Sequence, residues 1–431
     1  MRFNRLLLLL TLCVILTGCA GLGASESAEI ETMEEHPVIG TTAVPAAKAL
    51  TILVFLSDDT PRYAEAFTEQ TQVEIEFAEP SNAAFERMLT DFAAGKSTYD
   101  IVGVDNALGS LYTMDPLLDQ GYFLPLTDVP TVGEAVGQML PQLQELVTRE
   151  GTIYALPHFV LFKLLHYNEP LYQAVAEGQL AQYNRSADLP VTEEQAENLP
   201  PQRAFDSWEE LLSTGYLDEM DGDLAYNTML EQYILNAGEE GFTFDSPEFV
   251  RALELMKTAK MSDGQVPGDA LGLQIGGVAI CSAGKIETCN AYYPLPTLDG
   301  QERIPMAYGV LAVNSFTDRA EDALRFLDVA AEIGLRGTDK DVPETQRYGM
   351  PETAACYTDE KHIAVSAGLD PENQARWREM QANLVPITDA GFLTSFHLEL
   401  FPQYLDGAIT AEQCAAQTQE RYRMYKLEQG E

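Results

Sequence analysis

The alternation of short apolar strands and amphipathic helices from residue 50 onward most narrows the folds open to this chain. Leu50 to Leu56 is a continuous apolar run, short enough to be a strand buried on both faces of a parallel sheet. A helix is predicted over Pro61 to Gln70, followed by an alternating strand over Val73 to Phe77. Apolar residues from Phe85 to Phe92 recur at helical spacing, and Tyr99 to Val104 is the next strand. This order predicts an open α/β sheet with right-handed crossovers.

The length of the chain indicates more than one lobe. With 431 residues, 46% of them hydrophobic, the chain exceeds what one core usually supports. Further strand-like runs occur at Gly276 to Ile280, Ala291 to Pro296 and Ala307 to Val313. Ser246 before Pro247 is typical of a helix start, and Thr410 with Gln413 forms a capping-box pattern ahead of a last helix. The sequence has no repeat of fixed period, which disfavours a solenoid or propeller.

Residues 1–18 have the pattern of a secretory signal peptide. Arg2 and Arg5 precede the apolar run Leu6 to Leu16, which is shorter than the roughly 20 residues of a membrane-spanning helix. The run ends on Leu16 to Cys19, which resembles a bacterial lipobox, so we expect removal of the signal and lipidation of the Cys19 thiol. Residues 19–47 then form a flexible lipidated tether, since two acyl chains suffice for stable anchoring. The alternative is ordinary cleavage that leaves Cys19 buried.

The charge of the chain excludes one class of partner. Its formal net charge is −41, and its basic residues are not clustered. A nucleic-acid-binding protein needs clustered Lys and Arg to neutralise phosphates, so no nucleic-acid partner is expected. We attribute the acidity to solubility at a crowded cell surface.

The cysteines beyond the signal segment form no recognisable metal or redox motif. Cys281, Cys289, Cys356 and Cys414 contain no C-x-x-C pair, so no metal site and no cofactor are expected. Outside the cytoplasm these four thiols could form two disulfides in three alternative pairings, of which Cys281 with Cys289 is the first choice.

Motifs for catalysis are incomplete in this sequence. Gly95-Lys96-Ser97 would end a phosphate-binding loop, but Thr90 stands where that loop requires glycine. The histidines form no H-E-x-x-H pattern, and no G-x-S-x-G elbow occurs. We therefore expect a protein that is not an enzyme. A secreted glycan-acting hydrolase needs only two suitably spaced carboxylates, and it stays open as an alternative.

Several short segments stand in a characteristic order. They are Leu50 to Leu56, Ser97 to Asp105, Gly121 to Leu126, Gly151 to Pro157 leading to Tyr167-Asn168, Phe205 to Leu211, Tyr293 to Gly300 and Gly309 to Ser315. Their order is similar to that in bacterial extracellular solute-binding proteins of ABC importers, the family that includes the maltose- and oligosaccharide-binding proteins.

This resemblance implies an α/β fold of two lobes. Each lobe would be an open, mostly parallel sheet flanked by helices, and hinge strands would join the lobes. The implied bounds are 48–157 plus 306–348 for lobe I and 158–305 plus 349–431 for lobe II. The candidate hinges are Leu156 to Val160, Met306 to Val310 and Tyr348 to Pro351.

The resemblance also implies a function. We expect a monomeric extracytoplasmic protein, anchored to the bacterial cell membrane by its lipid, that closes two lobes around a small solute. It would deliver that solute, with a sugar or oligosaccharide favoured, to the membrane permease subunits of an ABC transporter.

The aromatic content leaves the solute open. Sugar-binding relatives usually stack sugars on tryptophan, but this chain has only Trp208 and Trp377, and both positions fit structural roles. A small polar or cationic solute such as a polyamine is therefore an alternative ligand. A surface sensor or adhesin without a transport role is an alternative of another class.

Ligands of open α/β sheets bind beyond the carboxyl ends of the strands, so candidate contacts follow the predicted strands. Asp58 and Asp59 follow the first strand, and Asp105 and Asn106 follow the third. Their oxygens could accept hydrogen bonds from sugar hydroxyls or pair with a cation. An alternative role for Asp59 is to cap the helix that begins near Pro61.

The remaining candidate contacts follow from the resemblance. Phe159 could replace tryptophan as a stacking side chain, and Tyr226 with Asn227 begins a helix that supplies contacts in relatives, although Tyr226 could equally be core. Ser282 lies in a loop that often carries an aromatic residue in the family, but none is present here. A late loop that reaches back toward the ligand contributes Thr388, Asp389 and Phe392.

Overall fold

A computed structural model shows Lys48–Glu431 as one compact unit. The described residues are 49–54, 60–106, 114–185, 190–215, 217, 219–236, 243–259, 273–276, 291–298, 303–336, 351–387 and 399–429. Among the helices in these ranges, none has the length and apolarity that a membrane crossing requires.

The first sheet begins with three parallel strands. β1 (Leu50–Leu53) lies between β2 (Ile75–Ala78) and β3 (Ile101–Asp105), and both pairings are parallel. Every residue of β3 is buried, as expected for a strand covered on both faces. α2 (Thr60–Thr71) and α3 (Asn82–Ala93) connect these strands in the predicted order. The sequence pattern therefore located this strand and helix succession correctly, to within a few residues.

A long strand, β10 (Ile304–Val313), completes the first sheet. It pairs antiparallel with β3 and with β6 (Ala155–Phe162), and its first residues pair parallel with β11 (Leu384–Pro386). The register between β10 and β6 shifts between Gly309 and Val310. Three of the five strand pairings are parallel, so the sheet is mixed but mostly parallel.

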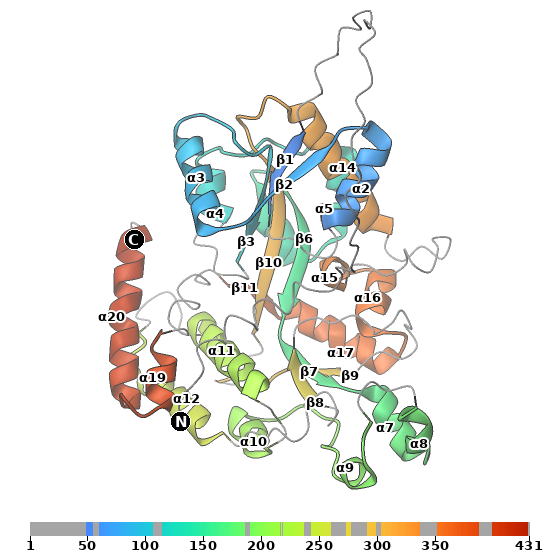
Figure 1. Cartoon of the computed structure of the whole chain (residues 1–431), viewed down its shortest axis with the longest axis vertical. Coiled ribbons are helices and arrows are strands. Elements are labelled where there is room, and N and C mark those ends of the chain that lie inside the picture. The colour runs from blue at the N-terminus through green and yellow to red at the C-terminus, as the bar shows by residue number, and fades with distance from the viewer. Residues whose placement is uncertain are drawn as a thin grey trace, which may run out of the picture. The chain divides into compact units, whose positions relative to one another are not determined.

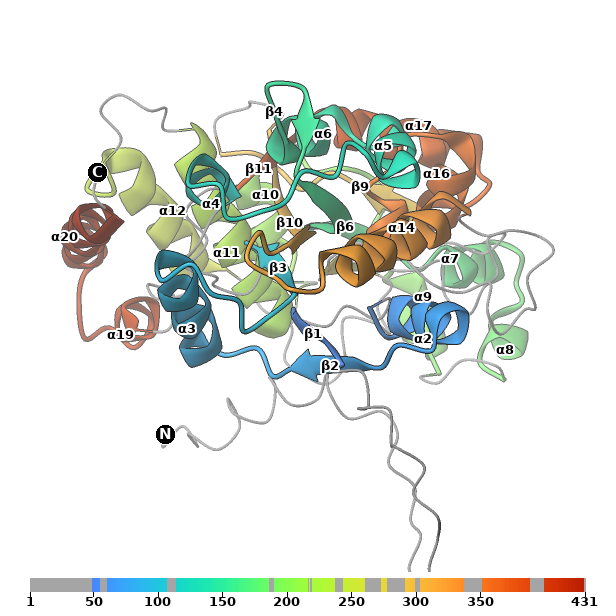
Figure 2. The same cartoon turned by 90° about the horizontal axis from the view of Figure 1, so that it is seen from above.

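Helices flank the first sheet on two sides (Figures 1 and 2). α2, α5 (Pro130–Gln138) and α14 (Ala320–Arg336) lie on one side, and α3 and α4 (Met114–Asp119) lie on the other. The remaining elements of this part are α6 (Pro141–Val147), the hairpin of β4 (Thr148–Arg149) and β5 (Thr152–Ile153), α15 (Pro351–Ala354), α16 (Glu360–Ala367) and α17 (Pro371–Ala382).

A second, three-stranded sheet follows β6 along the chain. β7 (Leu164–Tyr167) lies between β8 (Leu273–Gly276) and β9 (Ala291–Tyr293). Both pairings are antiparallel, unlike the parallel pairings expected in this lobe. Several helices separate β7 from β8, so no compact strand–helix–strand unit fixes a parallel direction here. Beyond Gly276, the strand predicted to Ile280 lies outside the described residues.

The helices that accompany the second sheet lie between β7 and β8 and after β11 along the chain. They are α7 (Glu169–Ala176), α8 (Leu180–Tyr183), α9 (Glu193–Glu197), α10 (Trp208–Ser213), α11 (Glu219–Asn236), α12 (Pro247–Thr258), α19 (Phe401–Leu405) and α20 (Ala411–Gln429).

Two predicted helix starts are confirmed by their hydrogen bonds. The Ser246 side chain accepts a hydrogen bond of 3.1 Å from the Phe249 N–H at the start of α12. At the start of α20, the Thr410 N–H donates to Gln413 Oε1 at 2.9 Å and the Gln413 N–H donates to Thr410 Oγ1 at 3.2 Å. Both starts use local side chains to satisfy amides that the helix itself leaves unpaired.

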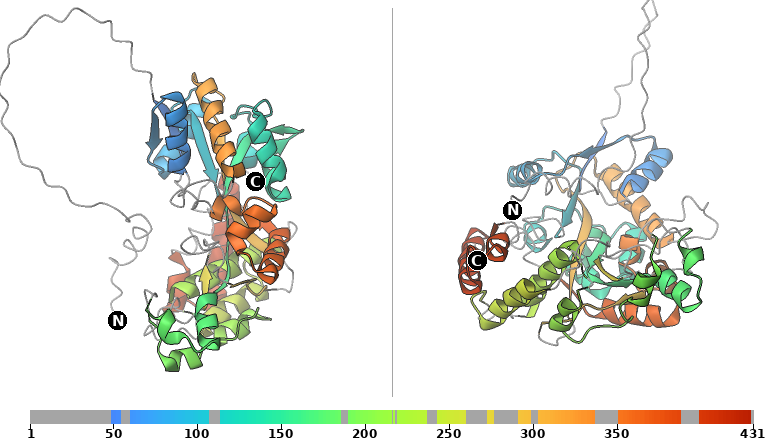
Figure 3. Two further views of the ribbon diagram at one scale, coloured as in Figure 1. Left: turned by 90° about the vertical axis from the view of Figure 1, so that its right-hand side faces the viewer. Right: turned by 60° about the horizontal axis from the view of Figure 1, so that its bottom comes forward.

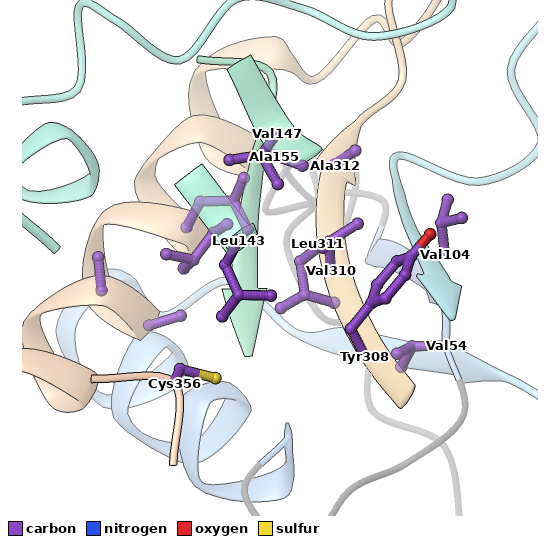
Figure 4. Packing of buried hydrophobic residues seen from close by; sticks show 14 of the residues in the cluster. Val54, Val104, Leu143, Val147, Ala155, Tyr308, Val310, Leu311, Ala312 and Cys356 are labelled. Carbon is purple, nitrogen blue, oxygen red and sulfur yellow. The ribbon is translucent and has the colours of Figure 1, made fainter. Parts of the chain in front are cut away.

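The buried apolar residues form two large cores. The first is built on β1, β3, β6 and β10, and Figure 4 shows Tyr308 beside Val54 and Val104 on one side of β10, with Leu143 and Cys356 on the other. The second core is built on β7, α10, α11, α12 and the segment after residue 399. Two cores fit the expectation that one core does not suffice for this chain.

Within the described residues, the chain passes between these cores at three places. They lie between Leu164 and Leu165, between Leu295 and Met306, and between Leu384 and Ile387. Tyr292 of β9 also reaches the first core, where its ring lies 5.5 Å from that of Trp377. Figures 1 and 3 show β6 and β10 extending from the first sheet toward the second group of elements.

The core to which each residue belongs can be compared with the predicted bounds of the two lobes. These bounds stay a prediction. Cys356, Tyr357, Trp377 and Met380 belong to the first core, whereas the implied bounds put residues 349–431 in lobe II. We therefore favour placing residues 351–384 with lobe I.

Candidate functional site

The described residues include some of the predicted ligand contacts. They are Asp105, Asn106, Phe159, Tyr226 and Asn227. Asp58, Asp59, Ser282, Thr388, Asp389 and Phe392 lie outside the described residues, as does the predicted lipidation residue Cys19.

Asp105 is the last residue of β3 and lies at the carboxyl end of a parallel strand, where ligands of such sheets bind. It is 3% exposed and is paired in the sheet with Gly309 of β10. Burial, and to a smaller degree the nearby Asp105 carboxylate, raises the pKa of the Tyr308 hydroxyl to about 12, while a hydrogen bond with the Met114 backbone acts in the opposite direction. Tyr308 was not predicted as part of the site.

Phe159 of β6 lies on the other side of Gly309. In the register, Gly309 is paired with both Asp105 and Phe159, so the three residues form one row across the sheet. A Cβ atom added at Gly309 would lie 2.0 Å from Cε1 of Phe159, so the ring occupies the space that a side chain would fill. Directly paired residues share a sheet face, so the row places an aromatic ring and a carboxylate on the same face of the sheet.

His158 lies next to this row and is fully buried. Its ring meets the Phe159 ring edge-on at 4.9 Å, and its backbone oxygen accepts a hydrogen bond of 2.5 Å from Thr353 Oγ1. Burial lowers the pKa of His158 to about 3, because the apolar surroundings disfavour the charged imidazolium. The imidazole is therefore neutral at physiological pH.

Asn106 follows Asp105, and its side chain forms hydrogen bonds with two backbone segments that are distant in the sequence. Its Oδ1 accepts a hydrogen bond of 2.6 Å from the Tyr308 N–H, and its Nδ2 donates to the Ile387 oxygen at 2.6 Å. Nδ2 also lies 3.5 Å from the Met306 oxygen. Both ends of the amide are thus engaged by the backbone, and its predicted role as a ligand contact stays a prediction.

Tyr226 and Asn227 belong to α11 and to the surroundings of the second core. The Tyr226 ring stacks on Phe401 with centroids 3.5 Å apart and planes 5° apart. Tyr226 is 1% exposed, and burial raises the pKa of its hydroxyl. The core alternative stated for Tyr226 is thus the observed environment, and Asn227 is half-buried beside it on the helix.

Both tryptophans are buried, as their predicted structural roles require. The Nε1 of Trp208 donates a hydrogen bond of 2.9 Å to Gln232 Oε1, and Trp377 lies 5.3 Å from the Phe162 ring in the first core. Neither indole ring is therefore exposed on the surface.

An ion pair that sequence reasoning missed lies at the first passage between the cores. Lys163 separates β6 from β7, and its Nζ lies 2.5 Å from Glu231 Oε1 of α11. The two side chains are 21% and 14% exposed, so the pair is largely shielded from solvent. The sequence offered no signal for it, because the partners are 68 positions apart.

The described residues show no group of three or more His, Cys, Asp or Glu side chains that could hold a metal ion. Cys356 and Cys414 are both buried. Cys281 and Cys289, the first choice for a disulfide, lie outside the described residues.

No protein-family model matches the chain, and a search of curated protein sequences also finds no match. Solved structures do match over nearly the whole described unit. An ABC transporter solute-binding protein from Thermotoga lettingae bound with alpha-D-tagatose has a TM-score of 0.56 at 17% identity, covering 88% of this chain and 100% of its own.

Two further structures show the same likeness. A solute-binding protein from Agrobacterium radiobacter in complex with ribitol has a TM-score of 0.57 at 14% identity, covering 88% of this chain and 99% of its own. The GacH receptor of Streptomyces glaucescens, solved with acarbose, has a TM-score of 0.55 at 15% identity, covering 88% and 98%. The two-lobed α/β fold expected from the sequence is therefore confirmed.

Proposed function

We propose that this protein binds a sugar or polyol between two lobes and delivers it to the membrane permease subunits of an ABC importer. The observation that carries the proposal is the likeness of fold, which extends over 88% of this chain and the full length of a solute-binding protein solved with a bound sugar. The two cores and the three passages between them supply the architecture that such a mechanism needs.

Closure follows from differential binding. A solute that contacts both lobes binds the closed arrangement more tightly than the open one, and it shifts the population toward closure by that difference in affinity. The closed form would then be the form that the permease recognises. On this proposal the protein is a binding protein and has no catalytic step.

The row of Asp105, Gly309 and Phe159 is the proposed lobe I contact. A carboxylate accepts hydrogen bonds from sugar hydroxyls, and an aromatic ring packs on the apolar face of a sugar. Both groups come to the carboxyl end of β3 through the pairing of β10 with its two neighbours. The same carboxylate would pair with a cation, which is why polyamines belong in the test.

The location of the protein is part of the proposal. The N-terminal pattern supports secretion, removal of residues 1–18 and lipidation at Cys19. The mature protein would then be a monomer held at the outer face of the bacterial cell membrane by a tether of residues 19–47.

A thermal-shift screen tests the function directly. A ligand that binds only the folded state stabilises it by about 2.7 kcal/mol at a concentration of 100 times its Kd. We expect one or more monosaccharides, polyols or oligosaccharides to raise the melting temperature. A shift with polyamines alone would select the cationic alternative, and no shift with any solute would contradict the proposal.

The ligand found in that screen then tests Asp105. We expect Asp105→Ala to weaken its binding at least about tenfold, equivalent to about 1.4 kcal/mol, as measured by calorimetric titration. The matched control is Asp100→Ala, because Asp100 is equally buried but accepts hydrogen bonds from the Thr51 N–H at 2.8 Å and Thr317 Oγ1 at 2.5 Å. Asp100→Ala should lower stability and leave affinity unchanged. Equal affinities for Asp105→Ala and wild type would remove Asp105 from the site.

A further inference from the structure

The second and third passages between the cores meet at one point of the first sheet. Met306 and Tyr308 lie in β10 just after the second passage, and both belong to the first core. Ile387 follows β11 and belongs to the second core. Their backbones are already joined, because the Ile387 N–H donates to the Met306 oxygen at 3.0 Å.

The Asn106 side chain closes this junction into a ring of hydrogen bonds. Its oxygen accepts from the Tyr308 N–H and its nitrogen donates to the Ile387 oxygen, each at 2.6 Å. The Asn106 backbone N–H donates to the Tyr308 oxygen at 3.1 Å. One amide thus joins residues 202 and 281 positions away along the chain.

The chemistry of this junction requires a carboxamide. A carboxamide presents an acceptor and two donors on one planar group, and the junction offers it one N–H and two carbonyl oxygens. Asp in its ionised form offers only acceptors, so it could keep the bond to the Tyr308 N–H but would face the Ile387 and Met306 oxygens with negative charge. Asn106 is 3% exposed, so solvent has little access to replace a lost bond.

We propose that Asn106 is a positioning residue for lobe closure, which ties the second and third passages to the end of β3 so that they move as one hinge. The inference rests on the closing mechanism of the proposed function. It assigns to Asn106 a role in hinge geometry in place of the ligand contact that the sequence predicted.

The test measures the spread of lobe positions without any ligand. Spin labels are placed on non-natural amino acids at Arg87 of α3 and Glu209 of α10, whose side chains are 65% and 71% exposed, so that the native cysteines remain. Pulsed electron resonance then gives the distribution of the distance between the labels. We expect Asn106→Ala and Asn106→Asp to widen this distribution at least about twofold relative to wild type, because the passages no longer move together.

Asn314→Ala is the matched control. Asn314 is also a buried asparagine, 1% exposed, whose Nδ2 donates to the Tyr99 oxygen at 2.9 Å and whose Oδ1 accepts from the Phe316 N–H at 2.9 Å. It directly follows β10, and its partners Tyr99 and Phe316 lie away from the second and third passages, so its loss should reduce stability without widening the distribution. Equal widths for the Asn106 and Asn314 variants would overturn the proposal.

Two provisions keep the test decisive. If Asn106→Ala does not fold, Asn106→Asp carries the test, since it retains the bond to Tyr308. Hydrogen exchange on the wild type adds a measurement without substitution. The backbone amides of Tyr308 and Ile387 should exchange with the same free energy of opening. Clearly unequal protection of the two amides would contradict the proposed coupling of the two passages through Asn106. Because no solute is present, a failed solute screen leaves this result unaffected, and an unchanged distance distribution leaves solute binding standing.

Discussion

Gly309 is the residue on which the candidate site depends most directly. The Phe159 ring fills the space beside its Cα, and Phe159 is 6% exposed, so the ring has little room to move away. A side chain at this position would separate the aromatic ring from the strand that carries Asp105. The absence of a side chain at residue 309 is therefore a condition for the row of three residues.

We predict that Gly309→Ala destabilises the fold by about 1–3 kcal/mol, the usual cost of overpacking a filled core. Urea unfolding measures this. The control is Gly133→Ala in α5, where an added Cβ meets nothing within 4 Å and should stabilise the helix by about 0.5–1 kcal/mol. A second substitution, Phe159→Leu, should restore part of the loss in Gly309→Ala. Equal stability of Gly309→Ala and wild type would show that the ring yields without cost.

His158 makes stability depend on pH. Its pKa is lowered from an ordinary value of 6.5 to about 3 by burial, so between these values the unfolded chain binds a proton that the folded chain does not. Stability therefore rises with pH through this window. Acidification from pH 6.5 toward 3 progressively removes the contribution of the neutral His158 to stability. The share of His158 is at most about 1.4 kcal/mol for each pH unit below its ordinary pKa.

We predict that His158→Gln loses this dependence. The difference in unfolding free energy between wild type and His158→Gln, measured in urea at pH 7 and pH 5, should shift by about 2 kcal/mol in favour of the variant at the lower pH. The acidic residues are common to both proteins, so their titration cancels in the difference. A difference that stays constant with pH would show that His158 has its ordinary pKa in the fold and would contradict the effect of burial.

Among the elements, several helices begin where local side chains satisfy their first amides. α20 begins with the reciprocal pair of Thr410 and Gln413, and α12 begins with Ser246. These starts could be read from a few adjacent residues. The sheets are different, because β10 takes β3, β6 and β11 as neighbours from three separate parts of the chain.

Thr410→Ala tests the start of α20. It removes the acceptor for the Gln413 N–H and should lower stability by about 1 kcal/mol in thermal or urea unfolding. Thr410→Ser keeps a hydroxyl at the same position and should cost much less. If the two variants lose equal stability, the hydroxyl is not the source of the effect.

At the scale of the whole molecule, two cores joined at three passages divide the described chain into parts that are each internally packed. The second and third passages lie side by side through β10 and β11, and the first is held by Lys163 and Glu231. Such an architecture permits a rotation about the passages that leaves both cores intact. Solute binding by closure is the use that we propose for it.

The proposed anchor belongs to this scale because it decides where the molecule acts. We predict that Cys19→Ser abolishes incorporation of labelled palmitate and releases the protein from the membrane fraction of a bacterial host. Cys13→Ser is the control, because Cys13 lies within the predicted signal segment and should be removed with it. Continued labelling of Cys19→Ser, or loss of labelling in Cys13→Ser alone, would contradict the assignment of the lipidated thiol.

Local patterns in the sequence predict many of the elements and the fold class. Strand and helix periods between Leu50 and Val104 and the caps at Ser246 and Thr410 are local signals, and the structure confirms them. The ordered segments also indicated a two-lobed solute-binding fold. The parallel pairing expected around β7 was wrong, because pairing direction depends on how distant segments meet.

Which side chains meet depends on long-range contacts that the sequence patterns do not predict. Asn106 was placed at the end of a strand by its sequence, but its partners Tyr308 and Ile387 are more than 200 positions away. Asp105 and Phe159 share one row of the sheet only because both are paired with Gly309 of β10. Contacts of this range depend on closing long loops of chain and on the packing of a whole core, and neither leaves a period or motif among neighbouring residues.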